Sequence, residues 1–505
     1  MVDSNQRKSG AILSYVSIIL GTLIQLLYTP LLIRMLGQSE YGLYSLVSSI
    51  IGYLTILDLG FGNAIVVYTA KYRAQKKYQE EKKLHGMFKI IFIIIGIIAG
   101  FLGILLYFFV PSIFGTTMTI YELEKTKIMM LILAFNLFIT FMFSIYSSII
   151  NAYEKFTFQK IMSILNTILK PLLMIPLLFL GYKSVTMTIV ITMINIIVCV
   201  SNSLYCRNKL NIKIKFCGFD KILFKTILGY SIWLFLGAIV DKINWSADQF
   251  ILGAVCSTAA VSIYSVASQL NQLFLNLSTA ISSVLLPKIT KMVAKKATKE
   301  ELTDEMIKVG RIQYYIMFLM CSGLILFGKS FIKWWAGEEF IDSYYIALLL
   351  IIPVCFPLIQ NLGLSIMQAM NKYKFKTIST AIMSILNIII SFFLAKNYGP
   401  IGAAFGTTIS LIICNIILIN IYYQKSIGIN IIKFWKNILK MTLSFIIPVI
   451  IILLVMYLTN IEGVTGYIIY IAVYIVLYCI ISYFVVMNEY EKNIIQKVTK
   501  RIVRR

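Results

Sequence analysis

The sequence predicts an all-α polytopic membrane protein of about fourteen transmembrane helices, with two parallel six-helix lobes around a central cavity and two further carboxy-terminal helices. Three observations predict this fold: the composition, the sidedness of the basic residues and an internal repeat. Of the 505 residues, 59% are hydrophobic and only 13% are charged, whereas a soluble globular chain has about 25% charged residues. The shortage of charge extends along the whole chain, which excludes a soluble protein with one membrane anchor.

Fourteen apolar runs are long enough to span a membrane, because a bilayer core about 30 Å thick requires roughly 20 helical residues. We expect the spans near Ala11–Ile33, Leu43–Tyr68, Ile90–Val110, Ile128–Ile150, Ile161–Leu180, Val185–Tyr205, Ile222–Ile251, Ala259–Leu286, Ile312–Ile332, Tyr344–Met370, Ile378–Leu394, Ile401–Tyr423, Ile438–Leu458 and Tyr467–Met487.

The connections between these spans are short. The longest external one is Pro111–Lys127, and the longest internal one is Lys288–Arg311. The internal connection contains Thr298-x-x-Glu301, a capping-box pattern that predicts a surface helix leading into the ninth span. No connection is long enough to form a soluble catalytic domain.

The 46 lysines and arginines lie mainly on one side of the predicted membrane. With the amino terminus in the cytoplasm, internal segments contain 37 of them, external segments contain 7, and Lys170 and Lys242 lie within spans. Basic residues are enriched in cytoplasmic loops, so we expect a multi-pass plasma-membrane protein with both termini in the cytoplasm. Because the basic loops would face anionic lipid headgroups, we expect no nucleic-acid partner.

The two halves of the sequence resemble each other at an offset of 215 to 220 residues. Ala152-x-x-Lys155-Phe156-x-Phe158 matches Ala369-x-x-Lys372-Tyr373-x-Phe375, and Leu36-Gly37 matches Leu252-Gly253. Spans one to six then match spans seven to twelve in the same direction. Parallel repeats of this kind place a transport cavity at their interface, which favours a transporter over a membrane enzyme.

The repeat also predicts the domain boundaries. We expect an amino-terminal lobe at residues 1–215 and a carboxy-terminal lobe at residues 216–425. Residues 426–505 would form the two extra helices and a basic cytoplasmic tail.

Five motifs occur in order along the chain: PLLIRMLGQSEYGLYSL (Pro30–Leu46), LDLGFGN (Leu57–Asn63), SADQFILG (Ser246–Gly253), PKIT (Pro287–Thr290) and YGPIGAAFGTTIS (Tyr398–Ser410). This series resembles the polysaccharide-unit flippases of the multidrug/oligosaccharidyl-lipid/polysaccharide exporter superfamily. The resemblance implies the same fourteen-helix fold and a transporter that moves undecaprenyl-diphosphate-linked oligosaccharides from the inner to the outer leaflet by alternating access, for cell-surface polysaccharide biosynthesis.

The resemblance implies membrane lipids and an H⁺ or Na⁺ gradient as further partners, and it leaves open a contact with the glycan polymerase machinery. The sequence has no GxxxxGK[ST] motif, which agrees with a transporter that has no ATP site. The eight cysteines form no CxxC pair and lie mostly in apolar runs, so we expect neither a metal site nor a cofactor.

Three alternatives remain. A cation-coupled multidrug exporter would share the fold, and fold alone does not choose the cargo. A peptidoglycan-precursor flippase would be favoured by arginines in the cavity, whereas arginines here occur mainly in loops. A membrane-embedded glycosyltransferase or polymerase would need paired carboxylates or a sizeable external loop, and the short external loops argue against an enzyme.

Charged side chains within spans are the candidates for function, since a charge in the bilayer is costly unless it faces water or a partner. Lys170 lies in the middle of the fifth span, directly before Pro171, and Pro176 follows about one turn after Pro171. Its ammonium group would suit the diphosphate of the cargo. The alternative is a structural lysine that pairs with Asp58 or with a backbone carbonyl.

The seventh span contains a second group of candidates. Asp241, Trp245 and Asp248 follow one another at i, i+4 and i+7 and therefore share one helix face. The aspartates would take up the coupling ion, and the Trp245 indole would stack on a sugar. Lys242 is a further substrate-binding candidate, while a structural cap is equally plausible for Asp248.

Asp58 is the third ion-coupling candidate. It lies in Leu57-Asp58-Leu59-Gly60, where the neighbouring glycine predicts a bend in the second span. A structural hydrogen bond at that bend is the alternative to ion coupling.

Overall fold

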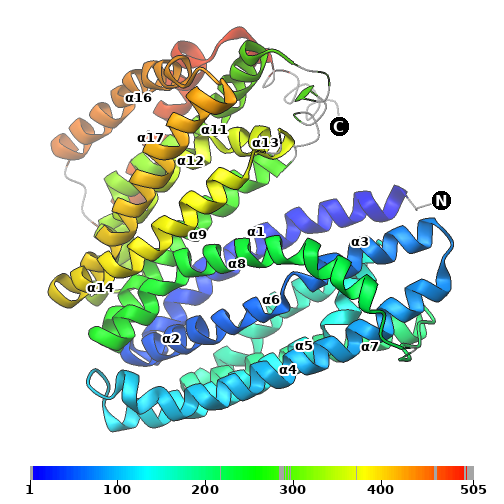
Figure 1. The fold of residues 1–505 in the computed structure, drawn as a ribbon. Helices are drawn as coiled ribbons and strands as arrows, with labels where there is room; N and C mark the ends of the chain where they lie inside the picture. Colours follow the sequence, from blue (N-terminus) through cyan, green and yellow to red (C-terminus); the bar gives the residue numbers. More distant parts are fainter. Residues whose placement is uncertain are drawn as a thin grey trace. The chain divides into compact units, whose positions relative to one another are not determined.

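The structure is a computed structural model that describes residues 4–216, 218–283, 297–370, 372–459 and 463–493, together with a few single positions between and after these ranges. Regular structure in this part of the chain is entirely helical (Figure 1). The described part of the chain is therefore all-α, as the sequence predicts. Three of the four PKIT residues and the carboxy-terminal arginines lie outside the described residues.

Eleven helices in the described residues are long and apolar enough to cross a membrane. The longest of them, Lys374–Ile427, is interrupted at Gly399, whose φ of 61° is not helical. This break separates the predicted eleventh and twelfth spans. Two more helices cover the predicted seventh and eighth spans. The number fourteen is consistent with these helices and stays a prediction.

Close contacts divide the chain into two compact units, Met1–Ser265 with Ala395–Pro400, and Val266–Leu394 with Ile401–Arg505. The helices of the first unit are α1 (Ser4–Leu36), α2 (Gln38–Leu54), the 3₁₀ turn η1 (Thr55–Asp58), α3 (Phe61–Ala74), α4 (Tyr78–Phe114), α5 (Ile120–Ala152), α6 (Phe156–Phe179), α7 (Ser184–Asn208), α8 (Lys221–Val255) and the first turns of α9 (Thr258–Ser283).

The second unit contains the rest of α9 and the remaining helices. These are α11 (Lys299–Trp335), η2 (Glu338–Phe340), α12 (Asp342–Ile359), α13 (Asn361–Ala369), α14 (Lys374–Leu411), the π-helical η3 (Ile412–Leu418), α15 (Ile419–Tyr422), η4 (Tyr423–Ile427), α16 (Ile431–Thr459), α17 (Gly463–Ile481) and η5 (Ser482–Val486). The predicted lobes at residues 1–215 and 216–425 differ from these contact-based units, and the lobe boundaries stay a prediction.

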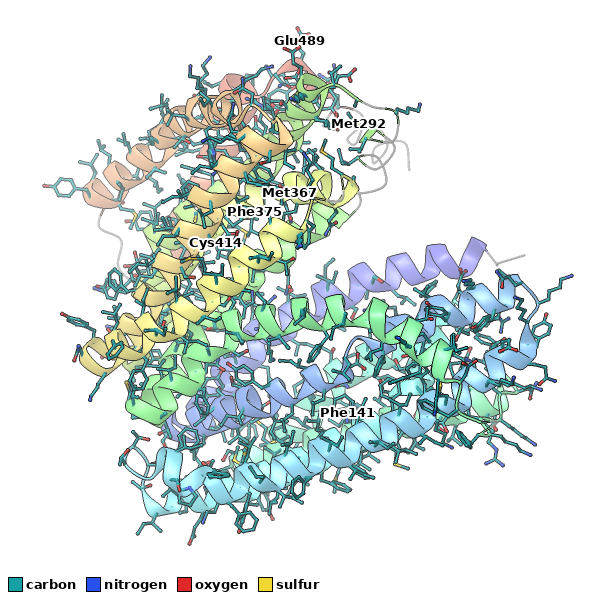
Figure 2. The ribbon with its side chains drawn as sticks, viewed as in Figure 1. Phe141, Met292, Met367, Phe375, Cys414 and Glu489 are labelled. Carbon is teal, nitrogen blue, oxygen red and sulfur yellow. The ribbon has the colours of Figure 1, made fainter. Side chains whose placement is uncertain are left out.

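In the first unit, α5 packs along both α4 and α7. The contact with α4 is close because small residues face each other. A Cβ atom added to Gly103 would lie 2.3 Å from the Ala134 Cβ. Buried apolar side chains of α5, such as Phe141, fill the remaining space (Figure 2).

The predicted bend in the second span is present. After α2, the chain tightens into the 3₁₀ turn η1 and then passes through left-handed backbone at Leu59 (φ 52°) and Gly60 (φ 71°) before α3 begins. The second predicted span is therefore two helices joined at LDLG.

Two predictions about connections have opposite outcomes. Thr298 and Glu301 form the predicted capping box, and α11 continues from it into the ninth span, as expected. The prediction of a loop at Pro111–Lys127 is wrong, because α4 continues to Phe114 and α5 begins at Ile120. A second capping box, between Thr119 and Glu122, starts α5 at Ile120, before the predicted span that begins at Ile128.

A pair of stacked rings repeats in the two halves of the chain. Phe158 stacks on Tyr205 with ring centres 3.9 Å apart, and Phe375 stacks on Tyr422 with ring centres 4.1 Å apart. Phe375 is labelled on α14 in Figure 2. Both residues of the second pair lie 217 positions after those of the first, which is within the offset of the sequence repeat.

Candidate functional site

The first unit contains an open pocket of about 290 Å³ among α2, α5, α6 and α7. Its wall is unusually polar for a site at the level of the apolar spans, with seven hydroxyl, amide or ammonium side chains. The lining residues are Ser48, Ile51, Gly52, Thr55, Leu133, Asn136, Leu137, Thr140, Asn166, Lys170, Ile191 and Asn195.

Lys170 is the cation of this pocket. It is half-buried on α6, and among the described residues no carboxylate lies within ion-pair distance of its ammonium group. The structural alternative of a pair with Asp58 is therefore not realised. One turn earlier on the same helix, Asn166 Oδ1 is buried and has no hydrogen-bond partner among the described residues. Buried polar groups usually have a hydrogen-bond partner, so both groups are candidates to bind a polar ligand at this pocket.

Three polar side chains on the opposite wall hold one another in place. Asn195 Nδ2 on α7 donates to Asn136 Oδ1 (2.5 Å) and to Thr140 Oγ1 (2.7 Å), both on α5. Thr140 Oγ1 in turn donates to the Asn136 carbonyl (2.8 Å). This network fixes amide groups at the pocket surface, where they can bind hydroxyl groups of a sugar.

Lys242 lies close to the same pocket. Helix α8 packs against α2, with Ser49 Oγ donating to the Ser246 carbonyl (3.2 Å). One turn along, the Lys242 ammonium group lies against Gly52, a residue of the pocket wall, since a Cβ atom there would be 2.8 Å from Nζ. The structure thus brings two of the predicted cations, Lys170 and Lys242, toward one pocket from two helices.

The other candidates on α8 lie away from this pocket. Trp245 is 37% exposed and is not part of the pocket wall. Asp248 is buried and accepts a hydrogen bond from the Tyr264 hydroxyl on α9, which agrees with a structural role. The side chain of Asp241 lies outside the described part of the structure.

Asp58 lies at the end of η1, one turn after the pocket residue Thr55. It is half-buried, and its carboxylate accepts a hydrogen bond from the Gly62 backbone at the start of α3. This contact stabilises the bend, as the structural interpretation predicts. The roles of all six candidate residues stay predictions.

The sequence analysis missed the polar neighbours of Lys170. A signal was present, because Asn136 and Thr140 are four residues apart, as are Asn166 and Lys170. Polar side chains at this spacing share a helix face. In the second half, the residue that matches Lys170 by offset is Asn387, which is fully buried and bonds to Ser391 and Thr407.

Comparison with known proteins agrees with this architecture. A family model described as "Polysaccharide biosynthesis protein" matches residues 8–293, which is more than half of the chain. A putative O-antigen transporter of Shigella flexneri is 22% identical over 410 residues, which cover 79% of this chain and 93% of that protein. The capsular polysaccharide biosynthesis protein CapF of Staphylococcus aureus is 27% identical over 205 residues, or 40% of this chain and 50% of CapF.

Solved structures show the same fold. The lipid II flippase MurJ in an inward closed conformation has a TM-score of 0.73 at 22% identity and covers 94% of this chain and 97% of its own. An inward-facing multidrug resistance transporter of the MATE family has a TM-score of 0.61 at 14% identity and covers 78% of this chain and 96% of its own. The fold is that of the multidrug/oligosaccharidyl-lipid/polysaccharide exporter superfamily, and the chain belongs to its polysaccharide biosynthesis protein family.

Proposed function

We propose that this protein is a flippase for lipid-linked oligosaccharides, which it moves from the inner to the outer leaflet by alternating access. The cargo would be an oligosaccharide joined through a diphosphate to undecaprenol. The family membership and the O-antigen transporters among the relatives support a cargo of this class.

The observation that carries the proposal is a lysine in a polar pocket that has no carboxylate partner among the described residues. Keeping a charge inside a span costs several kcal/mol, so a cation without a protein partner is best explained by an anionic ligand. A diphosphate would supply that charge, and the amide groups of Asn136, Asn166 and Asn195 would bind the hydroxyl groups of the adjoining sugar.

The pocket volume limits what part of the cargo is recognised here. Ligand pockets usually measure about 300–1,000 Å³, so a pocket of about 290 Å³ matches a small head group in size. The diphosphate and the first sugar would therefore be bound in the first unit, while the remaining sugars lie elsewhere. A cargo recognised mainly by its diphosphate allows one protein to move glycans of different composition.

The test is flipping of a fluorescent undecaprenyl-diphosphate sugar in reconstituted vesicles, with and without H⁺ and Na⁺ gradients. We expect Lys170→Ala to lower the flipping rate at least tenfold and Lys170→Arg to retain a substantial part of it. Lys160→Ala on the same helix, outside the pocket, is the matched control and should flip normally. Normal flipping by Lys170→Ala would refute the assigned role of the lysine, and failure of the parent protein to flip any such lipid would refute the function.

A further inference from the structure

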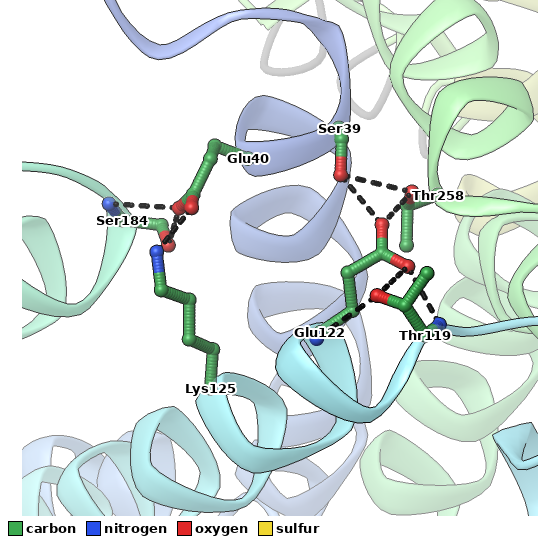
Figure 3. A network of polar contacts seen from close by, with 7 residues as sticks. All are labelled: Ser39, Glu40, Thr119, Glu122, Lys125, Ser184 and Thr258. Carbon is green, nitrogen blue, oxygen red and sulfur yellow. Dashed lines mark hydrogen bonds and ion pairs between the residues drawn. The ribbon is translucent and has the colours of Figure 1, made fainter.

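Two helix ends from different halves of the repeat meet at one carboxylate in the first unit. The hydroxyl groups of Ser39, in the first turn of α2, and Thr258, at the start of α9, lie 2.5 Å and 2.7 Å from Glu122 Oε1 on α5 (Figure 3). Because both hydroxyl groups donate to the same oxygen, Glu122 joins α2 to α9.

Ser39 and Thr258 occupy corresponding places in the repeat. They are 219 residues apart, which is within the repeat offset, and their Oγ atoms are separated by 3.3 Å. Two equivalent residues come this close only near the pseudo-twofold axis that relates the halves. The contact is therefore the place where the two halves of the repeat meet at this end of the spans.

The second oxygen of Glu122 keeps its carboxylate in place. Oε2 accepts hydrogen bonds from the Thr119 backbone N–H and hydroxyl group, each at 2.9 Å, and so closes the capping box of α5 (Figure 3). The cap orients the side chain whether or not Ser39 and Thr258 are present. Oε1 is thus an acceptor held in place by the cap, and the ends of α2 and α9 both bind to it.

The backbones at this junction are in direct contact. A Cβ atom on Gly42 of α2 would lie only 1.9 Å from the Thr258 carbonyl oxygen, so no larger residue fits without separating α2 from α9. Nearby, Thr117 Oγ1 donates to the Gly253 carbonyl at the end of α8 (2.7 Å). The first half of the repeat therefore contacts the chain on both sides of the turn between α8 and α9, before it at Gly253 and after it at Thr258.

A second polar cluster, formed by Glu40, Lys125 and Ser184, lies near this junction (Figure 3). Glu40 accepts hydrogen bonds from Lys125 on α5 and Ser184 at the start of α7 (Figure 3). All three residues belong to the first half, so this cluster holds helices of one half together. It provides a control of similar chemistry that does not join the halves.

We propose that Ser39, Glu122 and Thr258 form an external latch, which holds the outer ends of the two halves together and must open before cargo leaves toward the outside. The proposal rests on the proposed alternating-access function and on the sidedness of the basic residues, which places these helix ends outside. In this cycle Glu122 is a positioning residue, because it contacts the two helix ends and no part of the cargo.

The first test locks the latch. In a background without native cysteines, Ser39→Cys and Thr258→Cys are combined and oxidised, and flipping is measured before and after reduction. We expect oxidation to lower flipping at least tenfold and dithiothreitol to restore it, while each single cysteine variant is unaffected. Normal flipping by the fully cross-linked protein would overturn the proposal.

The second test loosens the latch and does not depend on transport. Ser39→Ala with Thr258→Val removes both donors and leaves the capping box intact, whereas Ser184→Ala removes a hydroxyl group from the control cluster. A cysteine at the pocket position Thr55 is labelled from outside with a membrane-impermeant maleimide. We expect severalfold faster labelling in the double variant only. Equal rates in the two variants would overturn the latch, even if the protein moved no lipid and the proposed function itself failed.

Discussion

Lys170 and its polar neighbours in the pocket differ in whether their side chains bind to other residues of the wall. Among the described residues the ammonium group has no carboxylate partner, whereas Asn136 and Thr140 are tied into a network by Asn195. A charged group thus lies in the same pocket as polar groups whose positions are already fixed. Fixed groups lose little conformational freedom on binding, which favours affinity for a polar head group.

A different pair of charges, Arg311 and Glu491, joins α11 to the segment after η5 in the second unit. Arg311 donates to both carboxylate oxygens of Glu491 at 2.6 Å and 2.8 Å, and Tyr315 also donates to Glu491 at 3.0 Å. Burial raises the pKa of the Glu491 carboxyl group, but the hydrogen bonds from Arg311, from the Asn488 backbone and from Tyr315 outweigh it. The net pKa lies below the usual value of 4.5.

This lowered pKa predicts a pH-dependent contribution to stability. A carboxyl group whose pKa is lower in the folded protein stabilises it at pH values above the unfolded pKa, and this contribution disappears as the pH falls through the folded pKa. We expect Glu491→Gln to lower the free energy of unfolding by about 3 kcal/mol at pH 7. The difference from the parent should shrink below about pH 4.

Thermal unfolding in detergent across pH 3–8 measures this effect, with Glu489→Gln as the control. Glu489 is two residues away and exposed (Figure 2), so its replacement should change little at any pH. A constant difference between Glu491→Gln and the parent down to pH 3 would contradict the assignment.

At the scale of helices, the contact between α4 and α5 depends on small residues. Gly103 faces Ala134 so closely that an added Cβ would lie 2.3 Å from the Ala134 Cβ, whereas a Cβ on Gly100 would lie 3.7 Å from its nearest neighbour. Gly103→Ala should therefore force the helices apart and destabilise the protein by about 1–3 kcal/mol. Gly100→Ala, one turn away, should be neutral or slightly stabilising because alanine favours helix. Equal melting temperatures for the two variants would contradict this packing.

The positions of the helices were largely predictable, and their contacts were not. Apolar runs mark the membrane-buried part of each helix, and Thr298-x-x-Glu301 marked a helix start in water. The hydropathy of Pro111–Lys127 did not show that α4 continues to Phe114 and that α5 begins at Ile120. Hydropathy marks the apolar part of a helix and does not mark where the helix ends. For Asn136, Asn166 and Asn195, spacing indicated a face on each helix, but only the three-dimensional packing shows that these faces line one pocket.

At the scale of the whole molecule, the sidedness of the basic residues predicts the orientation of the chain. Cysteines introduced at Lys183 and Lys213, in a background without native cysteines, should report opposite sides. We expect an impermeant maleimide to label Lys183→Cys in intact cells and Lys213→Cys only after permeabilisation. The reverse pattern would place the termini outside. It would then place the proposed latch on the opposite, cytoplasmic face.

The stacked rings Phe158–Tyr205 and Phe375–Tyr422 are a feature that the two halves of the repeat share. Ring pairs at the same offset in both halves agree with a repeat built from one shorter unit. Lys170 has no such counterpart, since the residue at the matching position is the buried Asn387. With the role proposed for Lys170, a change in one half of the repeat would be enough to alter what this pocket binds.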